Sequence, residues 1–251
     1  MQHNKPAATN YDPRKAERQW WDKADKREQK YRPGHYFAHN VVRSRIYENV
    51  KSLGCNQSSR ILDLGCGTGE DAIFISKASP NIIGIDLSLT ALKRFTNNGF
   101  NGIIADVKTL PFPDNSFDFT ISSGLLHHLV GQGKLQDYVK EFVRVTRTKG
   151  YVLALEPNVF NHSGFLMNVF NTFKPGITGL VPHERALSPV KLRRIFHEAG
   201  LTEAEYIAAS YVWNRFPLAI SKFISEHENR IRTIKPFSLF GWFEIIYGQK
   251  V

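Results

Sequence analysis

The spacing of apolar positions changes along the chain, and this change predicts the architecture. Over residues 36–52, apolar residues recur every three or four positions, which is typical of one face of an amphipathic helix. Beyond residue 60, helical patterns near 70–78, 88–98 and 134–147 alternate with short apolar runs. Each run is predicted to be a buried strand: Ile61–Leu64, Ile82–Ile85, Ile103–Ala105, Phe117–Ile121 and Tyr151–Leu155. Alternating strands and helices predict a parallel sheet that helices cover on both faces.

The pattern loosens after the fifth run. Residues 158–181 are rich in Phe, Asn and Gly and are predicted to be irregular, without a core helix. A helix is expected over 188–199, with Pro189 in its first turn and Gly200 as its stop. Two more strands, with a helix between them, are expected at Glu205–Ser210 and Trp242–Gly248.

These patterns predict a helical N-terminal extension, residues 1–58, and one α/β domain, residues 59–251, with insertions near 158–187 and 211–240. The 251 residues are 42% hydrophobic and 22% charged, as in soluble globular proteins. No apolar run approaches the roughly 20 residues that span a membrane. The N-terminus lacks the apolar segment of a secretory signal, so we expect a cytoplasmic location.

The net charge of +10 is unevenly distributed. Residues 1–60 carry 13 Lys and Arg against 6 Asp and Glu, whereas residues 61–150 carry 9 of each kind. A basic N-terminal arm predicts an anionic partner such as a phosphorylated substrate, nucleic acid or a membrane surface. A solvated helix face that only aids solubility explains the same charges equally well. The two cysteines, Cys55 and Cys66, cannot form a disulfide framework or a zinc cluster, and we assign no metal ligands.

The most informative segment is a glycine-rich turn between the first strand and the next helix. Three glycines follow Asp63 at alternating positions, and glycines let the backbone approach a ligand at a helix N-terminus. A dinucleotide-binding turn would place a glycine at position 70, where this chain has Glu70 followed by Asp71. These carboxylates would repel a pyrophosphate. The turn therefore favours a ligand that carries a sulfonium and an ammonium group.

Acidic residues also end the next two strands. Asp86 lies 21 residues beyond Gly65, where a carboxylate can accept hydrogen bonds from both hydroxyls of a ribose. Asp106 follows the third strand and can accept a hydrogen bond from an adenine amino group. Each acid alone could be a helix cap, but three at successive strand ends indicate a nucleoside site.

At this point the sequence resembles the class I S-adenosylmethionine-dependent methyltransferases, and among them the small-molecule group that includes ubiquinone and menaquinone methyltransferases. The resemblance covers residues 60–156 and rests on five motifs and one dipeptide, in this order: Asp63-Leu64-Gly65-Cys66-Gly67-Thr68-Gly69, Gly84-Ile85-Asp86-Leu87-Ser88, Ala105-Asp106, Leu110-Pro111-Phe112-Pro113-Asp114-Asn115-Ser116-Phe117-Asp118, Leu125-Leu126-His127-His128-Leu129 and Lys149-Gly150-Tyr151.

The resemblance implies a Rossmann-like, seven-stranded, mostly parallel sheet in the order 3-2-1-4-5-7-6, with the last strand antiparallel. It also implies S-adenosylmethionine as the cofactor. The residues expected to bind it are Asp63, Gly65, Gly67 and Gly69 at the methionine end, Asp86 with Leu87 at the ribose, Asp106 with Val107 at the adenine, and the backbone around Ser122 at the amino group.

Methyl transfer from a sulfonium needs alignment of the acceptor and exclusion of water more than it needs acid–base chemistry. His127 and His128 follow the fourth strand, at the edge where open α/β sheets bind ligands, and either could deprotonate an acceptor hydroxyl. Local packing explains the two histidines as well.

The acceptor class is narrowed by missing motifs. Ser122-Ser123-Gly124 stands where enzymes that methylate the amino groups of bases carry an Asn/Asp-Pro-Pro-Tyr/Phe motif. A small-molecule, lipid or glycan-intermediate acceptor, anionic or amphiphilic, is therefore expected, and nucleic acid is unlikely as a partner. Two alternatives remain: an RNA methyltransferase that uses the basic arm, and a cofactor-binding protein without catalysis.

Two further expectations concern regions outside the motifs. Aromatic and Met side chains are expected to close the acceptor pocket: Trp20, Trp21, Tyr31, Tyr36, Phe160, Phe165, Met167 and Phe170. In the insertion at 211–240, an apolar stripe that includes Phe223 and Ile224 lies among basic residues. The stripe is expected to pack on the domain or a second subunit, with transient membrane contact as the alternative.

Overall fold

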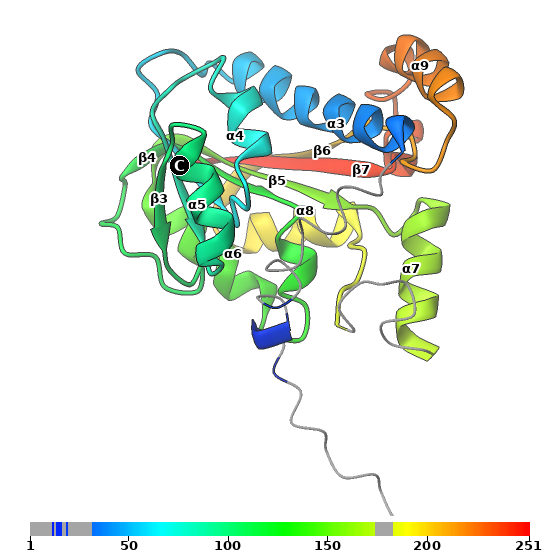
Figure 1. The fold of residues 1–251 in the computed structure, drawn as a ribbon. Helices are drawn as coiled ribbons and strands as arrows, with labels where there is room; N and C mark the ends of the chain where they lie inside the picture. The colour runs from blue at the N-terminus through cyan, green and yellow to red at the C-terminus, as the bar shows by residue number, and fades with distance from the viewer. Residues whose placement is uncertain (1–11, 13, 17–18, 20–31, 174–182) are drawn as a thin grey trace, which may run out of the picture.

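A seven-stranded sheet forms the centre of the protein. The computed structural model describes residues 12, 14–16, 19, 32–173 and 183–251. The strand order is β3-β2-β1-β4-β5-β7-β6 (Figure 1). The strands are β1 Ile61–Leu64, β2 Ile82–Asp86, β3 Asn101–Ile104, β4 Phe117–Ser123, β5 Thr146–Pro157, β6 Leu201–Ser210 and β7 Phe243–Lys250.

The directions of the strands confirm the predicted topology. The strands β1 to β5 pair in parallel, with Leu64 opposite Ile85 on one side and Ser122 on the other. The last strand, β7, lies between β5 and β6 and runs antiparallel to both. The carboxyl ends of β1, β2 and β4 therefore meet at one edge of the sheet.

Helices cover both faces of the sheet (Figure 1). They are α3 Pro33–Ser52, α4 Glu70–Ile75, α5 Leu89–Asn97, α6 Leu135–Val145, α7 His162–Phe173, α8 Pro189–Glu198 and α9 Leu218–His227, with short 3-10 turns η1 Leu126–His128, η2 Glu228–Arg230 and η3 Phe237–Phe240. Two apolar cores result, because successive side chains of a strand point to opposite faces. Ile61 packs with α3, α4 and α5, whereas Leu62 packs with α6 and α8.

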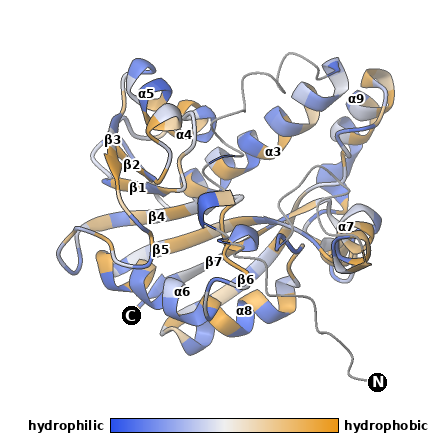
Figure 2. Cartoon of the chain, turned by 60° about the horizontal axis from the view of Figure 1, so that its bottom comes forward, coloured by the Kyte–Doolittle hydropathy of each residue, from blue (hydrophilic) through white to orange (hydrophobic). Residues whose placement is uncertain are grey.

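The hydropathy pattern of Figure 2 follows this layering, with apolar strands between helices whose outer faces are polar. In α6, for example, Tyr138 and Phe142 are buried and Asp137 and Lys140 are exposed. Helix α3 belongs to this core, since its Val42 and Ile46 are buried with the residues of β1 and α5. No helix in the described ranges combines the length and the apolar character needed to cross a membrane.

Part of the segment predicted to be irregular is a helix. Residues 162–173 form α7, which buries only Gly164 and Asn171, so it does not join the core. Two asparagines of this helix, a residue type that had suggested an irregular chain, form hydrogen bonds with the backbone of residues 184–186, later in the same insertion. Asn168 accepts from the amide of Ala186 at 2.7 Å and donates to its carbonyl at 3.0 Å. Asn171 donates to the carbonyl of Glu184 at 3.1 Å.

Candidate cofactor site

The glycine-rich turn joins β1 to α4 in a backbone conformation that favours glycine. Gly65, Gly67 and Gly69 have φ angles of 64°, 52° and 88°. A Cβ atom on Gly65 would lie 2.9 Å from Cδ1 of Leu125, so this position is also closely packed. The turn thus keeps its backbone open to a ligand while Leu125 covers it from the neighbouring loop.

Asp86, at the end of β2, fixes this turn. Its Oδ2 accepts a hydrogen bond from the amide of Gly67 at 2.9 Å, and its Oδ1 accepts one from the amide of Ser88 at 2.7 Å. The carboxylate is therefore held between the first and second strand ends. A ligand whose ribose binds Asp86 has its other end directed toward the glycines.

Asp63 is a buried carboxylate behind the turn. It is 1% exposed, and within the described residues its Oδ2 has no hydrogen-bond partner. Burial, together with the charges of Asp71 and Asp86, raises the pKa of Asp63 well above its usual range. A cationic group bound nearby would stabilise the ionised form, so the site electrostatically favours a positively charged ligand.

The acidic start of α4 has a partner in the N-terminal extension. Arg43 of α3 forms an ion pair with Glu70, and its Nε lies 3.5 Å from Oδ1 of Asp71. This pairing reduces the repulsion of anions that Glu70 and Asp71 were expected to cause. The preference for a cation therefore depends mainly on Asp63, which lies deeper.

A partly open cavity lies beside the turn. Five of the predicted cofactor residues line it, namely Gly65, Asp86, Leu87, Asp106 and Val107. It is also lined by Arg14, Ser88, Ala105, Gly124, Leu125, His128, Leu129 and Gln132. Residues from the ends of β2 and β4 and from the segment after β3 thus surround one space, as the predicted nucleoside site requires.

The remaining predicted residues, Asp63, Gly67, Gly69 and Ser122, are not among the residues that line the cavity. Gly67 and Gly69 belong to the turn, and Ser122 lies at the end of β4, paired with Leu64. The side chain of Ser122 shares the sheet face of Leu64 and not that of Asp63, so the two side chains do not converge. A role for Ser122 at a ligand amino group therefore has to come from its backbone.

Arg14 of the N-terminal arm is a cavity residue that the sequence did not single out. Its Nη1 lies 2.9 Å from Oδ2 of Asp106, whose Oδ1 accepts from the amide of Lys108 at 2.9 Å. The arm was expected to attract an anionic acceptor. In the structure, one of its arginines instead neutralises the carboxylate that was assigned to the adenine.

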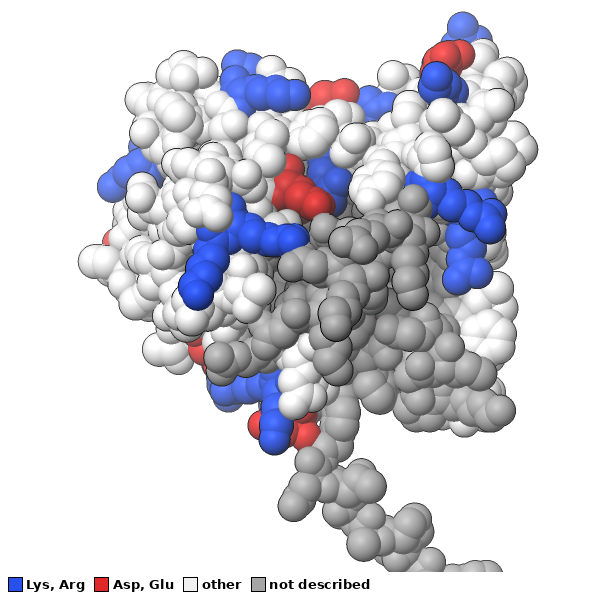
Figure 3. All heavy atoms as spheres, viewed as in Figure 1, with Lys and Arg blue, Asp and Glu red and all other residues white. Residues whose placement is uncertain are grey.

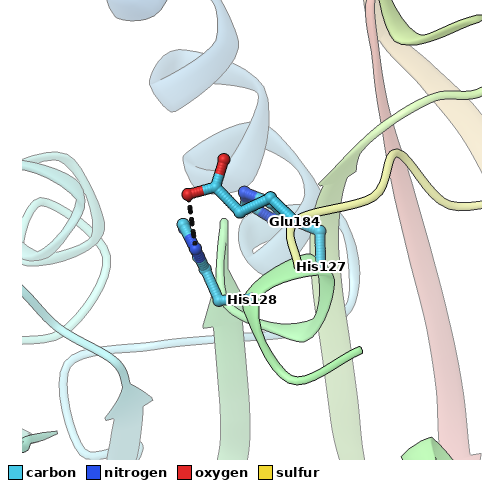
Figure 4. Close-up of side chains that lie close together, drawn as sticks. All are labelled: His127, His128 and Glu184. Carbon is cyan, nitrogen blue, oxygen red and sulfur yellow. Dashed lines mark ion pairs between the residues drawn. The ribbon is translucent and has the colours of Figure 1, made fainter. Parts of the chain in front are cut away.

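The two histidines lie in η1, and each contacts a buried glutamate. Figure 4 shows both histidines beside Glu184. His127 Nδ1 lies 2.7 Å from Oε2 of Glu156. The same carboxylate accepts hydrogen bonds from the amides of Leu125 and Leu126 at Oε1 and from the amide of His127 at Oε2. His128 Nδ1 lies 3.1 Å from Oε1 of Glu184. The two imidazole centroids are 3.9 Å apart. Of the two, His128 lines the cavity.

These glutamates were not predicted. Glu156 could have been predicted from the sequence, because a charged residue at the end of a buried strand lies where ligands bind in open α/β sheets. Glu184 gave none, because it lies in an insertion without periodicity and reaches the histidines only through the tertiary fold.

Of the aromatic and Met residues expected to close an acceptor pocket, those that the structure describes are absent from the cavity lining. Trp20, Trp21 and Tyr31 lie outside the described residues. Among the others, Tyr36, Phe160, Phe165 and Phe170 are exposed and Met167 is half-buried. Their role at the acceptor stays a prediction.

Comparisons with known proteins agree with this geometry. Residues 62–154 match the family model described as a methyltransferase domain. A demethylmenaquinone methyltransferase of Staphylococcus aureus is 35% identical over 130 residues, which cover 47% of this chain and 50% of that protein. The chain thus spans about half the length of the curated relatives it matches.

Solved structures support the fold over a longer range. A SAM-dependent methyltransferase of Thermotoga maritima, described as a possible histamine N-methyltransferase, superposes with a TM-score of 0.67 at 19% identity, covering 92% of this chain and 98% of that one. The [4+2]-cyclase SpnF superposes with a TM-score of 0.55 at 19% identity, covering 82% and 80%.

The chain therefore contains a class I S-adenosylmethionine-dependent methyltransferase domain, with the Rossmann-like sheet of that class. S-adenosylmethionine is the cofactor of the class. The residues present fit this cofactor, because the orphaned Oδ2 of Asp63 is a buried acceptor for a cationic group. In addition, the glycines of the turn have positive φ angles, and Gly65 lines the cavity, so the backbone can approach a ligand closely there.

Proposed function

We propose that this protein transfers a methyl group from S-adenosylmethionine to a small-molecule acceptor. The observation that carries the proposal is the shared cavity, which Gly65, Asp86 and Asp106 line from three successive strand ends. The match of residues 62–154 to the methyltransferase model supports it independently.

The bound cofactor would supply an electrophilic methyl group on a positively charged sulfur. Asp86 would accept hydrogen bonds from the ribose hydroxyls, and Asp106 with Val107 would bind the adenine. Asp63 would stabilise the positive charge at the methionine end, with the glycine turn and the backbone at Ser122 around it. The closed packing of Leu125 over Gly65 would help to exclude water from this end.

Either histidine of η1 could accept the proton of an acceptor hydroxyl. His128 lines the cavity, and His127 is oriented by its hydrogen bond to Glu156. A base is needed only where the acceptor must lose a proton before or during transfer. The proposal thus assigns His127 and His128 to the acceptor side and leaves the oxygen, nitrogen or carbon character of the accepting atom open.

An amphiphilic acceptor is supported by exposed apolar side chains on helices α7 and α9. Phe173 of α7 is 82% exposed and Phe223 of α9 is 63% exposed, and exposed Lys222 and Arg230 lie near Phe223 in the sequence. Exposed aromatic residues with basic neighbours are what transient contact with an anionic membrane requires. The relative named a demethylmenaquinone methyltransferase acts, by its name, on a quinone.

Co-sedimentation with vesicles of anionic phospholipid, at low and high salt, tests this contact. We expect salt-sensitive binding that the double variant Phe173→Ser/Phe223→Ser loses, while Asp137→Ala retains it. If the unmodified protein does not co-sediment with the vesicles, the membrane contact is contradicted and no longer supports an amphiphilic acceptor.

Two other functions have weaker support. An RNA methyltransferase would need a continuous basic surface, and on the face in Figure 3 the described Lys and Arg side chains form separate groups. A cofactor-binding protein without methyl transfer is the second, because the [4+2]-cyclase SpnF has a similar fold.

The decisive experiment is calorimetric titration with S-adenosylhomocysteine. Asp86→Ala is expected to weaken binding by at least tenfold, since each lost charge-assisted hydrogen bond is worth about 1.5–3 kcal/mol. Asp137→Ala, which removes an exposed carboxylate of α6 outside the cavity, is the matched control and should bind normally. An unchanged dissociation constant for a folded Asp86→Ala would contradict the ribose assignment, and turnover of no acceptor would favour the binding protein.

A further inference from the structure

Two histidines and two glutamates meet at the carboxyl edge of the sheet, beside the cavity. One nitrogen of His127, one nitrogen of His128 and one carboxylate oxygen of Glu184 all lie within 4.8 Å of one another (Figure 4). We propose that these three side chains bind a divalent transition-metal ion, with Zn²⁺ as the ion that suits the donor set. The sequence gave no reason to expect it, since Glu184 is distant from the histidines along the chain.

The composition and spacing of the donors suit a metal that also takes an exchangeable ligand. Two imidazoles and one carboxylate are a common set of three protein ligands, and they leave a fourth position open. Metal–ligand bonds of about 2.0–2.2 Å in a tetrahedral site place ligand atoms roughly 3.4 Å apart. His128 Nδ1 and Glu184 Oε1 are 3.1 Å apart, close to this value. No pair of donor atoms is more than 4.8 Å apart, so ion binding would require a closure of at most about 1.4 Å.

Glu156 provides the outer contact that metal-bound histidines usually have. Its Oε2 lies 2.7 Å from Nδ1 of His127, which leaves Nε2 as the nitrogen available to an ion. Glu156 is itself fixed, because its carboxylate accepts from the amides of Leu126 at 2.7 Å and of His127 at 3.2 Å. The orientation of His127 is therefore set before any ion binds.

The charges around the cluster also favour a cation. The side chains of Glu156 and Glu184 are each 1% exposed, and those of His127 and His128 are each 12% exposed. Two carboxylates buried beside the imidazoles make a divalent cation electrostatically favourable at this place. Metal binding should weaken as the pH falls, because protons compete with the ion for the imidazole nitrogens.

An ion at this site would adjoin the space where an acceptor reacts, because His128 also lines the cavity. Its open position would take an oxygen atom of the acceptor. With the ion bound, His127 and His128 act as its ligands in place of the role of base, and the proton of the acceptor passes to water. A hydroxyl bound to the ion releases its proton at lower pH than a free hydroxyl does. This role rests on the proposed methyl transfer, but the binding of the ion does not.

The test measures metal binding directly on tag-free, metal-stripped protein without cofactor. Calorimetric titration with Zn²⁺ should give one site with a dissociation constant in the micromolar range or below, and Co²⁺ should give the absorption bands of a four-coordinate ion. His127→Ala, His128→Ala and Glu184→Gln should each weaken Zn²⁺ binding at least tenfold. Glu156→Gln should weaken it by roughly 10–100-fold through the lost outer contact.

His197→Ala is the matched control, since His197 is an exposed histidine of α8 and its loss should leave Zn²⁺ binding unchanged. Circular dichroism establishes that each variant is folded, and the Co²⁺ spectrum of the unmodified protein decides the question should a variant unfold. Absence of stoichiometric binding by the unmodified protein, or equal binding by all folded variants, would overturn the metal site. A protein that binds S-adenosylhomocysteine but no Zn²⁺ refutes only this inference, whereas the reverse result refutes only the proposed function.

Discussion

Helices α5 and α9 have nearly equal lengths and both carry apolar side chains, yet they use them in opposite ways. Helix α5 buries Ala91, Leu92 and Phe95 against the sheet. Helix α9 buries only Ser221, and its Phe223 is 63% exposed. Helix α7 resembles α9, since it buries Gly164 and Asn171 while four large apolar residues stay exposed.

The cofactor half of the molecule is therefore held mainly by apolar burial. The peripheral helices α7 and α9 bury little apolar surface, apart from the partly buried Ile224 of α9, and depend more on polar contacts. For α9, the anchor is Glu228 in the turn that follows it. Its carboxylate lies 3.1 Å from Nη2 of Arg45 and accepts from Ser210 Oγ at 2.9 Å and the Tyr211 amide at 2.8 Å. This arrangement leaves the apolar side chains of the periphery available to a substrate or a surface.

The strongest test of this comparison removes the polar anchor. Glu228→Ala leaves Arg45 buried with only Glu48 as its remaining acid, and we expect a loss of about 3 kcal/mol of unfolding free energy. The loss corresponds to a fall of roughly 6–12 °C in Tm. Urea denaturation measures it, with the exposed Glu226→Ala as control. A Glu228→Ala protein as stable as the control would show that apolar contacts hold α9.

A smaller effect is expected in the cofactor half. Gly65→Ala and Gly54→Ala both place a side chain at positive φ, and each should cost roughly 1–2 kcal/mol of stability. Only Gly65 has a close neighbour at the cavity, whereas a Cβ on Gly54 meets nothing within 4 Å. We expect Gly65→Ala alone to lose S-adenosylhomocysteine binding. Equal affinity of both variants for S-adenosylhomocysteine, measured by calorimetry, would contradict the assignment of the glycine turn to the cofactor site.

The buried carboxylate of Asp63 should make cofactor affinity depend on pH. Burial raises the pKa of Asp63 in the free protein, and a bound ammonium group should lower it again, so binding releases a proton. Affinity for S-adenosylhomocysteine should therefore rise with pH from the usual carboxyl pKa up to the raised pKa, by up to tenfold for each unit of pKa difference. Over the same window, ionisation of Asp63 lowers the stability of the free protein.

Titrations from about pH 5 to about pH 9, in two buffers of different ionisation enthalpy, count the released proton. Asp63→Asn should remove this part of the pH dependence and, without ligand, should be more stable than the unmodified protein above the window. A dependence that persists in Asp63→Asn would assign the proton to another group.

The smallest effect is expected for the exposed apolar side chains. Phe173→Ser and Phe223→Ser should each change the unfolding free energy by less than about 0.5 kcal/mol, because neither ring is buried. Thermal denaturation checks this, with Phe95→Ser in α5 as the buried counterpart that should be severely destabilised. A large loss in Phe173→Ser would mean that α7 depends on apolar packing after all.

The sequence predicted the cofactor half closely because its signals are local. Ile61–Leu64 was placed as a strand with the bounds that the structure has, and the glycine turn follows it directly. In the segment after β5, composition misled the prediction. The asparagines of 162–173 bind the backbone of residues 184–186, and such distant partners cannot be seen in a local pattern.

The sequence alone determined the class of fold, the glycine turn and the acids at successive strand ends, because strand periodicity and backbone freedom at glycine depend on neighbouring residues. Only the tertiary structure brought Arg14 to Asp106, Arg43 to the start of α4, and Glu184 to the two histidines. These charged pairs join segments that are remote in the chain. Which residues pair depends on where the packed helices and the insertion lie, and a local sequence pattern does not contain this information.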